Sequence, residues 1–571
     1  MDKTDFVVRF AGEGGQGLLT SATMFAGAHT QFGYFTQTFA TFPSQIIGGP
    51  TWMQARVSTS EVFSRGDELD VLVAFNQEAY NNHKDEVKQD GIIIYNSGEF
   101  QLGNDTQSFG MPFDQLAKST GNTRSANFVV MGALAHLVNI PQSIFEEFNK
   151  KRFTRGRTGD DELIAANNQA LSLGKQEAIE NGFLLGKLAS PIKPDYEQIL
   201  VNGNEAICLG ALVAGLQFYV GYPISPATTI LTWMQSNLSG PGKFAYQASS
   251  EIESITSVLG AGFAGKKSMS ATAGPGFSLM GEGLGLAWMA EIPLVVADIQ
   301  RGGPATGLPT KTEQSDLFTV LTPAHGDVRL PVIAPGTVEE CFVATIAAFN
   351  WSERYQGPVI LLSEHVLSER QQNIRKPNVD EIQVEDRKVY SGNNEYHRYE
   401  GSTVSPMSIP GRPGSYVANG SEHDPMGDTT HLPIRHLQMT ERRFNKLKLL
   451  DDGTYEALDT GSSIAIMPWG GSKGPAFETY QRLIESGEDI SWYYTMYLNP
   501  LPSKLLDEIK SKDLVIIPEL NYQGQFSTIL RSYGVAAESI TQYTGLPFKV
   551  SDLEKSIRNR VQLERKKTTA L

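Results

Sequence analysis

Short apolar runs alternate with glycine-rich turns and helical patterns along nearly the whole chain. Residues 6–12, 71–75, 91–96 and 292–300 are apolar at almost every position. Strands of this composition are buried on both faces, which is typical of a parallel sheet covered by helices on both sides. The pattern therefore predicts an α/β protein built from doubly wound domains.

With 571 residues, the chain is long enough for three or four domains. We expect a first α/β domain over residues 1–190 and a second over 196–384, with a proline-containing linker at 187–200. Residues 385–455 are polar and break the pattern, so they are predicted to form an irregular connecting or interface segment. A third α/β domain is expected over 456–571.

Charge and cysteine content exclude several classes of protein. Forty-eight basic and 63 acidic residues give a formal net charge of −15, which disfavours broad binding to nucleic acid or to an anionic membrane. Cys208 and Cys341 are too few for a disulfide framework or for a four-iron cluster. No signal peptide and no apolar stretch of about 20 residues is found, so we expect a soluble, cytoplasmic protein that does not span a membrane.

A glycine-rich turn follows the first predicted strand and precedes a helical pattern. It contains Gly12, Gly14, Gly15, Gln16 and Gly17. Glycines at such a turn let backbone amides approach a phosphate group at the start of the helix. No acidic residue about 20 positions further on ends a second strand, as the ribose site of an NAD enzyme requires. Two interpretations stay open, a site for a nucleotide-like phosphate or a tight turn without a ligand.

A second motif, GYPISPATT, occupies residues 221–229 at the end of a predicted strand. Open α/β sheets bind ligands at the carboxyl ends of their strands. Ser225, Thr228 and Thr229 offer hydroxyl groups on this loop. A helix N-cap formed by Ser225 or Thr228 is an equally good interpretation.

Two glutamates, Glu251 and Glu253, stand at the start of a helix rich in small residues. A carboxylate in the first turn is favoured by the helix dipole alone. Residues two positions apart point to different faces of a helix, so the two are not expected to act as a matched pair. We expect one to face a cleft and the other to face solvent.

A glycine-rich loop over residues 300–314 follows the most apolar strand of the second domain. It contains Arg301 and Lys311. Cationic side chains in a stiff loop at the carboxyl end of a strand are suited to binding a carboxylate or a phosphate. A solvated surface loop is the alternative.

These motifs, in this order, resemble the α subunit of the 2-oxoacid:ferredoxin oxidoreductases, in particular the 2-oxoglutarate type with a γ domain fused at the N-terminus. The resemblance covers nearly the whole chain, and the long central motif is its most specific part. The motifs that carry it are GEGGQG, PSQIIGG (43–49), GYPISPAT, the stretch 271–317, HGD (325–327), SPMSIPG and SEHDPMG (421–427).

The resemblance assigns a type to each expected domain. Residues 1–190 correspond to a γ-type α/β domain, and 196–384 to a pyrimidine-type domain of the thiamine-diphosphate fold. Residues 456–571 correspond to an α/β domain like the C-terminal domain of transketolase. The segment 385–455 lies between the last two.

The resemblance also implies a reaction and a set of partners. Members of the family oxidise a 2-oxoacid with thiamine diphosphate, pass electrons through iron–sulfur clusters to ferredoxin and transfer the acyl group to coenzyme A. For 2-oxoglutarate the products are succinyl-CoA, CO2 and reduced ferredoxin, and the reaction is reversible, so its direction stays open. A β subunit is expected to carry Mg²⁺, the diphosphate and a [4Fe–4S] cluster, in an α2β2 assembly, and no metal site is expected on this chain.

Roles for individual residues around the cofactor follow from matched positions. Glu251 matches the glutamate that hydrogen-bonds the aminopyrimidine ring of the cofactor, while Glu253 is expected to be structural. Tyr222 is placed near the cofactor. Ser225, where relatives often have threonine, and Thr228 are expected at the substrate.

Other matched positions concern the substrate carboxylates and coenzyme A. Arg301 matches the arginine that pairs with the 1-carboxylate of the substrate. Lys311 and Thr310 are expected at the distal carboxylate of a diacid, an inference that does not come from a matched motif. The glycine turn at residues 12–17 is expected to line a phosphate site for coenzyme A.

Alternative functions stay open at this point. The chain could belong to an oxidoreductase for pyruvate, branched-chain or aryl oxoacids, because the motifs do not settle the substrate. A non-catalytic nucleotide-binding scaffold is compatible with GEGGQG and with the lack of cluster cysteines. A NAD-dependent dehydrogenase is disfavoured by the missing ribose-binding acid.

Overall fold

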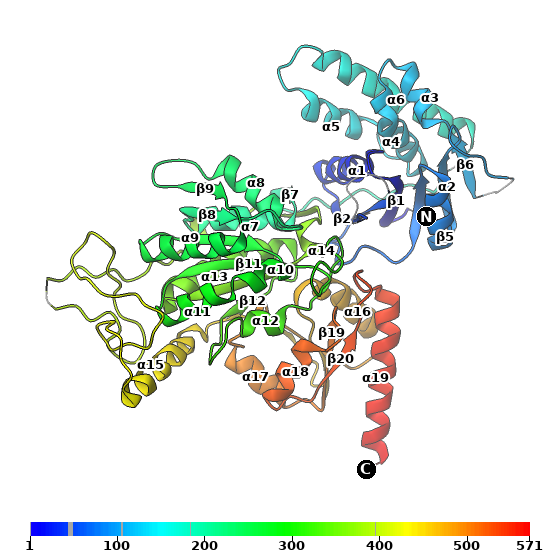
Figure 1. Ribbon diagram of the computed structural model, residues 1–571. Helices are drawn as coiled ribbons and strands as arrows, with labels where there is room; N and C mark the ends of the chain where they lie inside the picture. The colour runs from blue at the N-terminus through cyan, green and yellow to red at the C-terminus, as the bar shows by residue number, and fades with distance from the viewer. Residues whose placement is uncertain (1, 44–48, 104–106, 183, 394, 571) are drawn as a thin grey trace. The chain divides into compact units, whose positions relative to one another are not determined.

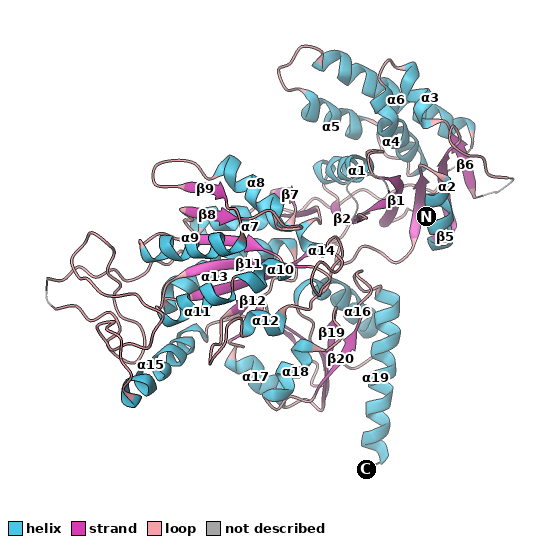
Figure 2. Cartoon of the chain, viewed as in Figure 1, coloured by secondary structure: helices cyan, strands magenta, loops and turns pink. Residues whose placement is uncertain are grey.

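The computed structural model describes residues 2–43, 49–103, 107–182, 184–393 and 395–570. The chain divides into two compact units (Figures 1 and 2). Unit 1 comprises residues 1–201 and 370–376, and unit 2 comprises 202–369 and 377–571. Both are mixed α/β structures, which confirms the predicted fold class. The PSQIIGG motif lies almost entirely outside the described residues.

The sheet of unit 1 is parallel on one side and antiparallel on the other. Its strand order is β6-β5-β4-β1-β3-β2-β14-β7. Strands β1, β4, β5 and β6 are parallel to one another, as predicted. Strands β2 and β3 are antiparallel to each other, and β3 is antiparallel to β1. Four of the seven residues of β2, FTQTFAT, are polar, so it lacks the continuous apolar run from which the other strands were predicted.

The elements of unit 1 have the following bounds. The strands are β1 (Asp5–Glu13), β2 (Phe35–Thr41), β3 (Pro50–Ser58), β4 (Leu69–Ala74), β5 (Val87–Asn96), β6 (Ser108–Met111), β7 (Gln198–Val201) and β14 (Gln372–Arg375). The helices are α1 (Leu18–Phe32), α2 (Gln77–His83), α3 (Phe113–Ser119), α4 (Ala126–Leu137), α5 (Ser143–Phe153) and α6 (Asp160–Glu180).

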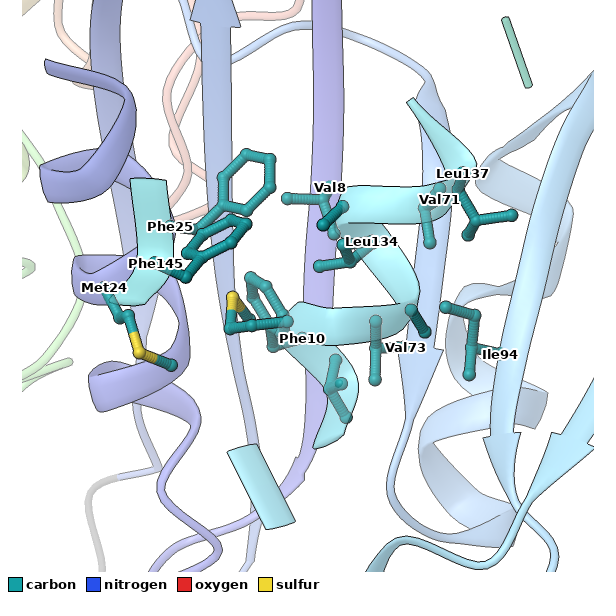
Figure 3. Close-up of a cluster of buried hydrophobic side chains, with 14 of the residues drawn as sticks. Val8, Phe10, Met24, Phe25, Val71, Val73, Ile94, Leu134, Leu137 and Phe145 are labelled. Carbon is teal, nitrogen blue, oxygen red and sulfur yellow. The ribbon is translucent and has the colours of Figure 1, made fainter. Parts of the chain in front are cut away.

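Both faces of this sheet are buried. On one face, strand residues pack against α1, α4 and α5 in the cluster of Figure 3. On the other face, alternate residues of the same strands form a second apolar cluster near α2. The labelled members of the first cluster are Val8, Phe10, Met24, Phe25, Val71, Val73, Ile94, Leu134, Leu137 and Phe145.

The larger sheet of unit 2 has the order β18-β12-β13-β11-β10-β8-β9 and is parallel except at β18. The carboxyl ends of β8, β10, β11 and β13 therefore meet at one edge, which we call the carboxyl edge. Helix α9 covers one face of the sheet, where the Ser268 hydroxyl of β10 donates to the backbone oxygen of Val258 at 2.9 Å. Helices α7 and α13 pack against each other, and α13 also packs on β11 and β13.

The elements around this sheet have the following bounds. The strands are β8 (Phe218–Gly221), β9 (Phe244–Gln247), β10 (Ser268–Thr272), β11 (Leu294–Gln300), β12 (Val332–Ile333), β13 (Pro358–Glu364) and β18 (Tyr497–Asn499). The helices are α7 (Gly203–Val213), α8 (Thr228–Asn237), α9 (Glu251–Phe263), α10 (Gly274–Leu279), α11 (Gly281–Met289), α12 (Leu317–Leu321), α13 (Val338–Tyr355) and α14 (His365–Ser368).

Unit 2 also holds a smaller sheet, of order β15-β17-β16-β19-β20. The stretch ISWYYTMY is expected as one strand but divides into β17 and β18, which belong to different sheets. The strands of this sheet are β15 (Glu456–Leu458), β16 (Ile464–Ile466), β17 (Ser491–Tyr494), β19 (Leu514–Glu519) and β20 (Ala537–Thr541). Its helices are α16 (Lys473–Glu485), α17 (Ser503–Lys510), α18 (Gln525–Ser532) and α19 (Val550–Ala570).

The connecting segment, residues 385–455, is irregular at first but ends in helix α15 (Pro433–Asn445), where the sequence predicts no helix. Buried ion pairs fix it to the rest of unit 2. The Arg442 guanidinium donates to the Glu291 carboxylate at 2.9 Å, and Lys446 lies 3.1 Å from the same group. Burial alone would raise the pKa of Glu291, but the nearby cations outweigh it and lower the pKa to about 2.

Candidate active site

Three loops and a helix start meet at the carboxyl edge of the larger sheet in unit 2. The glycine turn at 274–276 follows β10, Arg301 follows β11, and His365 follows β13. The loop at 221–229 follows β8, the strand next to β10. Parallel strands thus bring four separate sequence motifs to one place, which is where open α/β sheets bind ligands.

Glu251 is the first residue of α9 and is only 6% exposed. The Ser250 hydroxyl accepts from a backbone amide of the first turn and begins the helix at this point. The Glu251 carboxylate lies above Gly276, where its Oε1 atom would be 2.4 Å from an added Cβ. Among the described residues, no side chain or amide donates a hydrogen bond to this carboxylate. A buried acceptor at the carboxyl edge is therefore available to a ligand.

The carboxylate of Glu253, two residues further on, already accepts hydrogen bonds within the protein. It accepts from the backbone amide and the hydroxyl of Ser249, at 2.7 and 2.6 Å. These hydrogen bonds lower the pKa of Glu253. Its side chain closes the start of α9, so the two glutamates occupy different environments although they share one helix turn.

Arg301 is 8% exposed and reaches across the end of β10 to the loop after β8. Its Nη1 atom donates to the backbone oxygen of Ser225 at 2.7 Å. Its Nε atom is buried and has no hydrogen-bond partner in the described part of the chain. Burial lowers the pKa of Arg301, and the negative charge of Asp316 partly opposes this shift. The guanidinium keeps donors that an anionic ligand could use.

The loop at 221–229 holds Tyr222, Ser225 and Thr228, all predicted site residues. Tyr222 is 39% exposed, Ser225 is exposed, and Thr228 is half-buried at the first position of α8. The Asn204 side chain fixes the loop by donating to the backbone oxygen of Pro226 at 2.9 Å and to the hydroxyl of Thr229 at 2.7 Å. The structure therefore brings Ser225 to Arg301 and uses Thr229 to hold the loop.

Thr310 and Lys311 lie on the loop after Arg301 and are half-buried. The backbone oxygen of Lys311 accepts from the amide of Gly302 at 3.0 Å, which folds the loop back on itself. The Lys311 side chain packs against Gly545 of the smaller sheet's domain. Burial lowers the pKa of Lys311.

His365 is a buried residue of the carboxyl edge that the sequence analysis missed. Burial lowers its pKa to about 4, and the positive charges of Lys311 and Arg301 contribute to this shift. The imidazole is therefore neutral at pH 7. Both cations therefore lie within electrostatic range of His365. No pattern in the run ILLSEHVL distinguishes this histidine from an ordinary helix start.

A cavity of about 730 Å³ opens beside the carboxyl edge within unit 2. Its lining includes Arg301, Glu313, Asp316 and Tyr522. Burial raises the pKa of Asp316 to about 6, with Glu313 adding to the effect and Arg301 opposing it. Nothing in the sequence distinguishes Asp316, since it stands in a polar loop where an aspartate is common.

The glycine turn of unit 1, at residues 12–17, connects β1 to α1. Gly15 and Gly17 have φ angles of +100° and +77°, which favour glycine. The Gln16 side chain folds back over Gly12, and its Oε1 atom accepts from the backbone amide of Glu13 at 2.7 Å. Gly14 and Gly15 are exposed. This turn belongs to a different unit from the carboxyl edge.

Two protein family models match the chain. "Pyruvate ferredoxin/flavodoxin oxidoreductase" matches residues 7–177, and "Pyruvate flavodoxin/ferredoxin oxidoreductase, thiamine diP-bdg" matches residues 209–441. The 2-oxoglutarate oxidoreductase subunit KorA of Mycobacterium tuberculosis is 30% identical and aligns with 97% of this chain and 91% of its own length. The chain belongs to the 2-oxoacid:ferredoxin oxidoreductase family.

Other members of this family support the same assignment. The 2-oxoglutarate synthase subunit KorA of Methanothermobacter marburgensis is 38% identical over 60% of this chain and 93% of its own length. A solved 2-oxoglutarate:ferredoxin oxidoreductase from Magnetococcus marinus, with 2-oxoglutarate, coenzyme A and succinyl-CoA bound, aligns with a TM-score of 0.92. That chain is 37% identical, and the match covers 99% of this chain and 100% of the other.

Membership in the 2-oxoacid:ferredoxin oxidoreductases confirms the predicted family and the predicted class of enzyme. The relatives are named as subunits, so this chain acts together with partner subunits. Both cysteines, Cys208 and Cys341, are buried, as predicted. Within the described ranges, no helix has the length and hydropathy needed to cross a membrane.

Proposed function

We propose that this chain is the α subunit of a 2-oxoglutarate:ferredoxin oxidoreductase that uses thiamine diphosphate. The enzyme converts 2-oxoglutarate, coenzyme A and oxidised ferredoxin to succinyl-CoA, CO2 and reduced ferredoxin. The observation that carries this proposal is the buried Glu251 carboxylate at the carboxyl edge, which accepts no hydrogen bond from the described residues. The matched relatives and the bound molecules named for the Magnetococcus marinus enzyme support the choice of substrates.

The residues at the carboxyl edge fit the aminopyrimidine end of thiamine diphosphate. When bound, this cofactor supplies the carbon nucleophile for the 2-oxo group. Glu251 is buried and lies above the space left by the missing side chain of Gly276. The stretch just before it is joined to the start of the loop that holds Tyr222, where the Ala248 amide donates to the backbone oxygen of Gly221 at 2.9 Å. A carboxyl group in such a place can hold or exchange a proton with a ring nitrogen. We assign this role to Glu251 and a purely structural role to Glu253.

Two cations near the same edge suit a dicarboxylate substrate. Arg301 is assigned to the 1-carboxylate, with the hydroxyls of Ser225 and Thr228 beside it. Lys311 and Thr310 are assigned to the distal carboxylate. A monoacid such as pyruvate would use only the Arg301 site. The presence of 2-oxoglutarate enzymes among the relatives favours 2-oxoglutarate over pyruvate, branched-chain and aryl oxoacids.

The glycine turn of unit 1 is assigned to the phosphates of coenzyme A. Its exposed backbone at Gly14 and Gly15 precedes a helix of 15 residues. The helix N-terminus favours negative charge. Gln16 lies at this turn and must move if a phosphate oxygen takes its place over Gly12.

We place the remaining components on partner subunits. Two buried cysteines cannot ligate a four-iron cluster. The [4Fe–4S] cluster, Mg²⁺ and the diphosphate end of the cofactor are therefore assigned to a β subunit, in an α2β2 enzyme that reduces ferredoxin. We further place this enzyme in the cytoplasm.

The proposal is tested by producing the chain together with its partner subunit and measuring ferredoxin reduction with 2-oxoglutarate, pyruvate, 2-oxoisovalerate and an aryl oxoacid. We expect the highest kcat/KM with 2-oxoglutarate. Glu251→Gln should lower kcat by about 10²–10⁴-fold, the usual contribution of a positioned acid or base. The matched control is Glu253→Gln on the same helix turn, which should retain most of the activity. Normal turnover by Glu251→Gln, or a preference for a monoacid, would contradict the proposal.

A further inference from the structure

Asp298 is an ionisable residue in the middle of a mostly apolar strand. It lies in β11, its side chain is fully buried, and neither carboxyl oxygen has a hydrogen-bond partner among the residues that the structure describes. Buried carboxyl groups in native proteins are almost always hydrogen-bonded, so an unpartnered one calls for an explanation. Burial, with the charge of Asp316 second, raises the pKa of Asp298 well above its ordinary value. An ionised carboxylate is costly to bury without a partner, so the group is held as the neutral acid, which can donate its proton and accept a hydrogen bond at its other oxygen.

The side chain of Asp298 lies on the face of the sheet that α9 covers. Asp298 is paired in register with Thr272 of the parallel strand β10, so the two side chains point to the same face. Ser268, four residues before Thr272, points to that face as well and hydrogen-bonds α9. Glu251 is the first residue of α9. Thr272 and Asp298 therefore lie beneath the start of this helix.

Gly276 shows how close Thr272 and Glu251 are. A Cβ added there would meet the Thr272 hydroxyl oxygen at 2.2 Å and the Glu251 Oε1 atom at 2.4 Å. The two oxygens thus share the space of one missing side chain. The Thr272 hydroxyl makes only a long hydrogen bond, 3.4 Å, to the backbone oxygen of Ala273, so it can turn toward the carboxylate.

Asp316 lies at the other end of the same group of residues. Its carboxylate faces Gly274, where an added Cβ would meet Oδ2 at 2.8 Å. Its Oδ2 atom has no partner in the described part of the chain, and the residue lines the 730 Å³ cavity. The backbone amide of Asp316 donates to Gln300 Oε1 at 3.1 Å, and Gln300 lies two residues after Asp298 on the same face of β11, so the two carboxyl groups belong to one cluster. Asp316 therefore connects the buried acid to a space that water can enter.

We propose that Thr272 and Asp298 form a buried proton path between Glu251 and Asp316. In the forward step, Asp298 gives its proton to the Thr272 hydroxyl as that hydroxyl gives its own proton to Glu251. Asp298 is then reprotonated by Asp316, which takes a proton from a hydronium ion in the cavity and leaves a neutral water molecule there. One proton moves from the cavity to Glu251, and no bond other than O–H bonds is made or broken. The proposal rests on the role assigned to Glu251 above.

A structural role for Asp298 makes different predictions. A carboxyl group that only fills space would be replaced without penalty by asparagine, which has the same shape and is neutral. A residue in a proton path would not, because an amide does not release a proton at neutral pH. Thr272→Val and Thr272→Ser provide the same contrast, since only serine keeps the hydroxyl group.

The first experiment measures the protonation of Asp298 directly in the cofactor-free complex of this chain and its partner subunit. Infrared difference spectroscopy at neutral pH, comparing wild type with Asp298→Asn, should show the C=O band of a protonated carboxyl group that the variant lacks. Absence of that band would mean that Asp298 is ionised, and the proposed path would be overturned.

The second experiment measures how fast the proton on the reacting thiazolium carbon of bound thiamine diphosphate exchanges with deuterium, by acid quench and NMR. We expect Asp298→Asn and Thr272→Val to slow this exchange about tenfold, and Thr272→Ser to restore it. Ser270→Ala is the control, because Ser270 is buried without a hydrogen-bond partner on the same face but pairs in register with Val296, so it is not part of the proposed path.

The remaining outcomes distinguish the proton path from the role assigned to Glu251. If Glu251→Gln slows the exchange but Asp298→Asn and Thr272→Val do not, the proton path is wrong and the role of Glu251 stands. If Glu251→Gln exchanges at the wild-type rate, the role of Glu251 is wrong and the path loses its end point. If Ser270→Ala slows exchange as much as Asp298→Asn, the effect is a general one of packing and the path is overturned.

Discussion

Two glycine turns in this chain connect a strand to a helix in the same way but have different surroundings. Each follows a buried strand and begins a helix: residues 12–17 after β1 in unit 1, and 274–276 after β10 in unit 2. In the first turn, the space above Gly12 is filled by Gln16, a member of the same turn. In the second, the spaces above Gly274 and Gly276 are filled by the carboxylates of Asp316 and Glu251, which come from distant parts of the chain.

The first turn exposes its backbone, whereas the second accommodates charged side chains. The first leaves amides exposed at a helix start, a surface suited to phosphate groups. The second gathers acidic side chains in a partly enclosed space, where their protonation depends on their neighbours. Sequence alone does not show this difference, because the residues that fill the second turn lie far away along the chain.

Gly276→Ala should have the largest effect, because the new methyl group would overlap the Thr272 hydroxyl and the Glu251 carboxylate. We expect kcat with 2-oxoglutarate to fall at least as far as in Glu251→Gln, and stability to fall by about 1–3 kcal/mol from overpacking. Steady-state ferredoxin reduction and thermal unfolding measure the two effects. The matched variant is Gly12→Ala, where the obstructing atoms belong mainly to the flexible end of Gln16. Similar losses of kcat in both variants would remove the distinction between the turns.

Arg301→Gln should have the second-largest effect. A charge-assisted hydrogen bond contributes about 1.5–3 kcal/mol, so its loss should lower kcat/KM for 2-oxoglutarate about 10- to 150-fold. Most of this change should be in KM, since the guanidinium is assigned to substrate binding. Gln16→Ala in the other turn should leave the KM for 2-oxoglutarate unchanged. An unaltered KM in Arg301→Gln would place the carboxylate site elsewhere.

Histidines in the two units offer a smaller and more specific test. The pKa of His29 in unit 1 and that of His365 in unit 2 are both lowered to about 4, the first by burial and the second by burial together with Lys311 and Arg301. Lys311→Met should therefore raise the pKa of His365 toward its ordinary value and leave that of His29 unchanged. NMR titration of isotope-labelled histidine measures both. An unchanged pKa of His365 would show that Lys311 does not act on it.

The same two histidines should make stability depend on pH in acid. Between pH 6.5 and about 4 the unfolded chain binds more protons than the folded one, so the free energy of unfolding should fall as the pH falls through this range. Replacing either histidine with glutamine should make this decrease smaller. Denaturant unfolding at a series of pH values measures this decrease. A decrease as large in both variants as in the wild type would contradict the low pKa values.

Gly15→Ala should have the smallest effect. The φ angle of +100° disfavours alanine, but no atom lies within 4 Å of the added methyl group. We expect a loss of about 1 kcal/mol in stability and no change in the KM for 2-oxoglutarate. Thermal unfolding and steady-state kinetics measure these quantities. A large change in that KM would connect the first turn to the oxoacid site.

The sequence predicted the strands whose apolar runs are not interrupted by polar residues. Continuous apolar runs became β1, β4, β5, β11 and β13 within a residue or two at most boundaries. The antiparallel strands β2 and β3 were not predicted, because polar residues stand among their apolar residues. The helix predicted over FSLMGEGLGLAWMAE divides into α10 and α11 at Met280, and α15 was missed because basic residues mask its apolar positions.

The candidate site was predictable where a motif contains the residue, as at Glu251, Ser225 and Arg301. His365 and Asp316 were not, because their surroundings come from strands and loops that are distant in sequence. Asp298 could have been found. It is the single charged residue in the buried run PLVVADIQ, and a carboxyl group in a strand covered on both faces indicates either a partner or a function.

The central claim is that Glu251 meets the aminopyrimidine ring of thiamine diphosphate. A crystal structure of this chain with its partner subunit and the bound cofactor tests it most directly. We predict that one Glu251 carboxylate oxygen lies about 2.6–3.2 Å from a ring nitrogen. The account would be contradicted if the ring lay beyond hydrogen-bond distance of every carboxyl group of this chain.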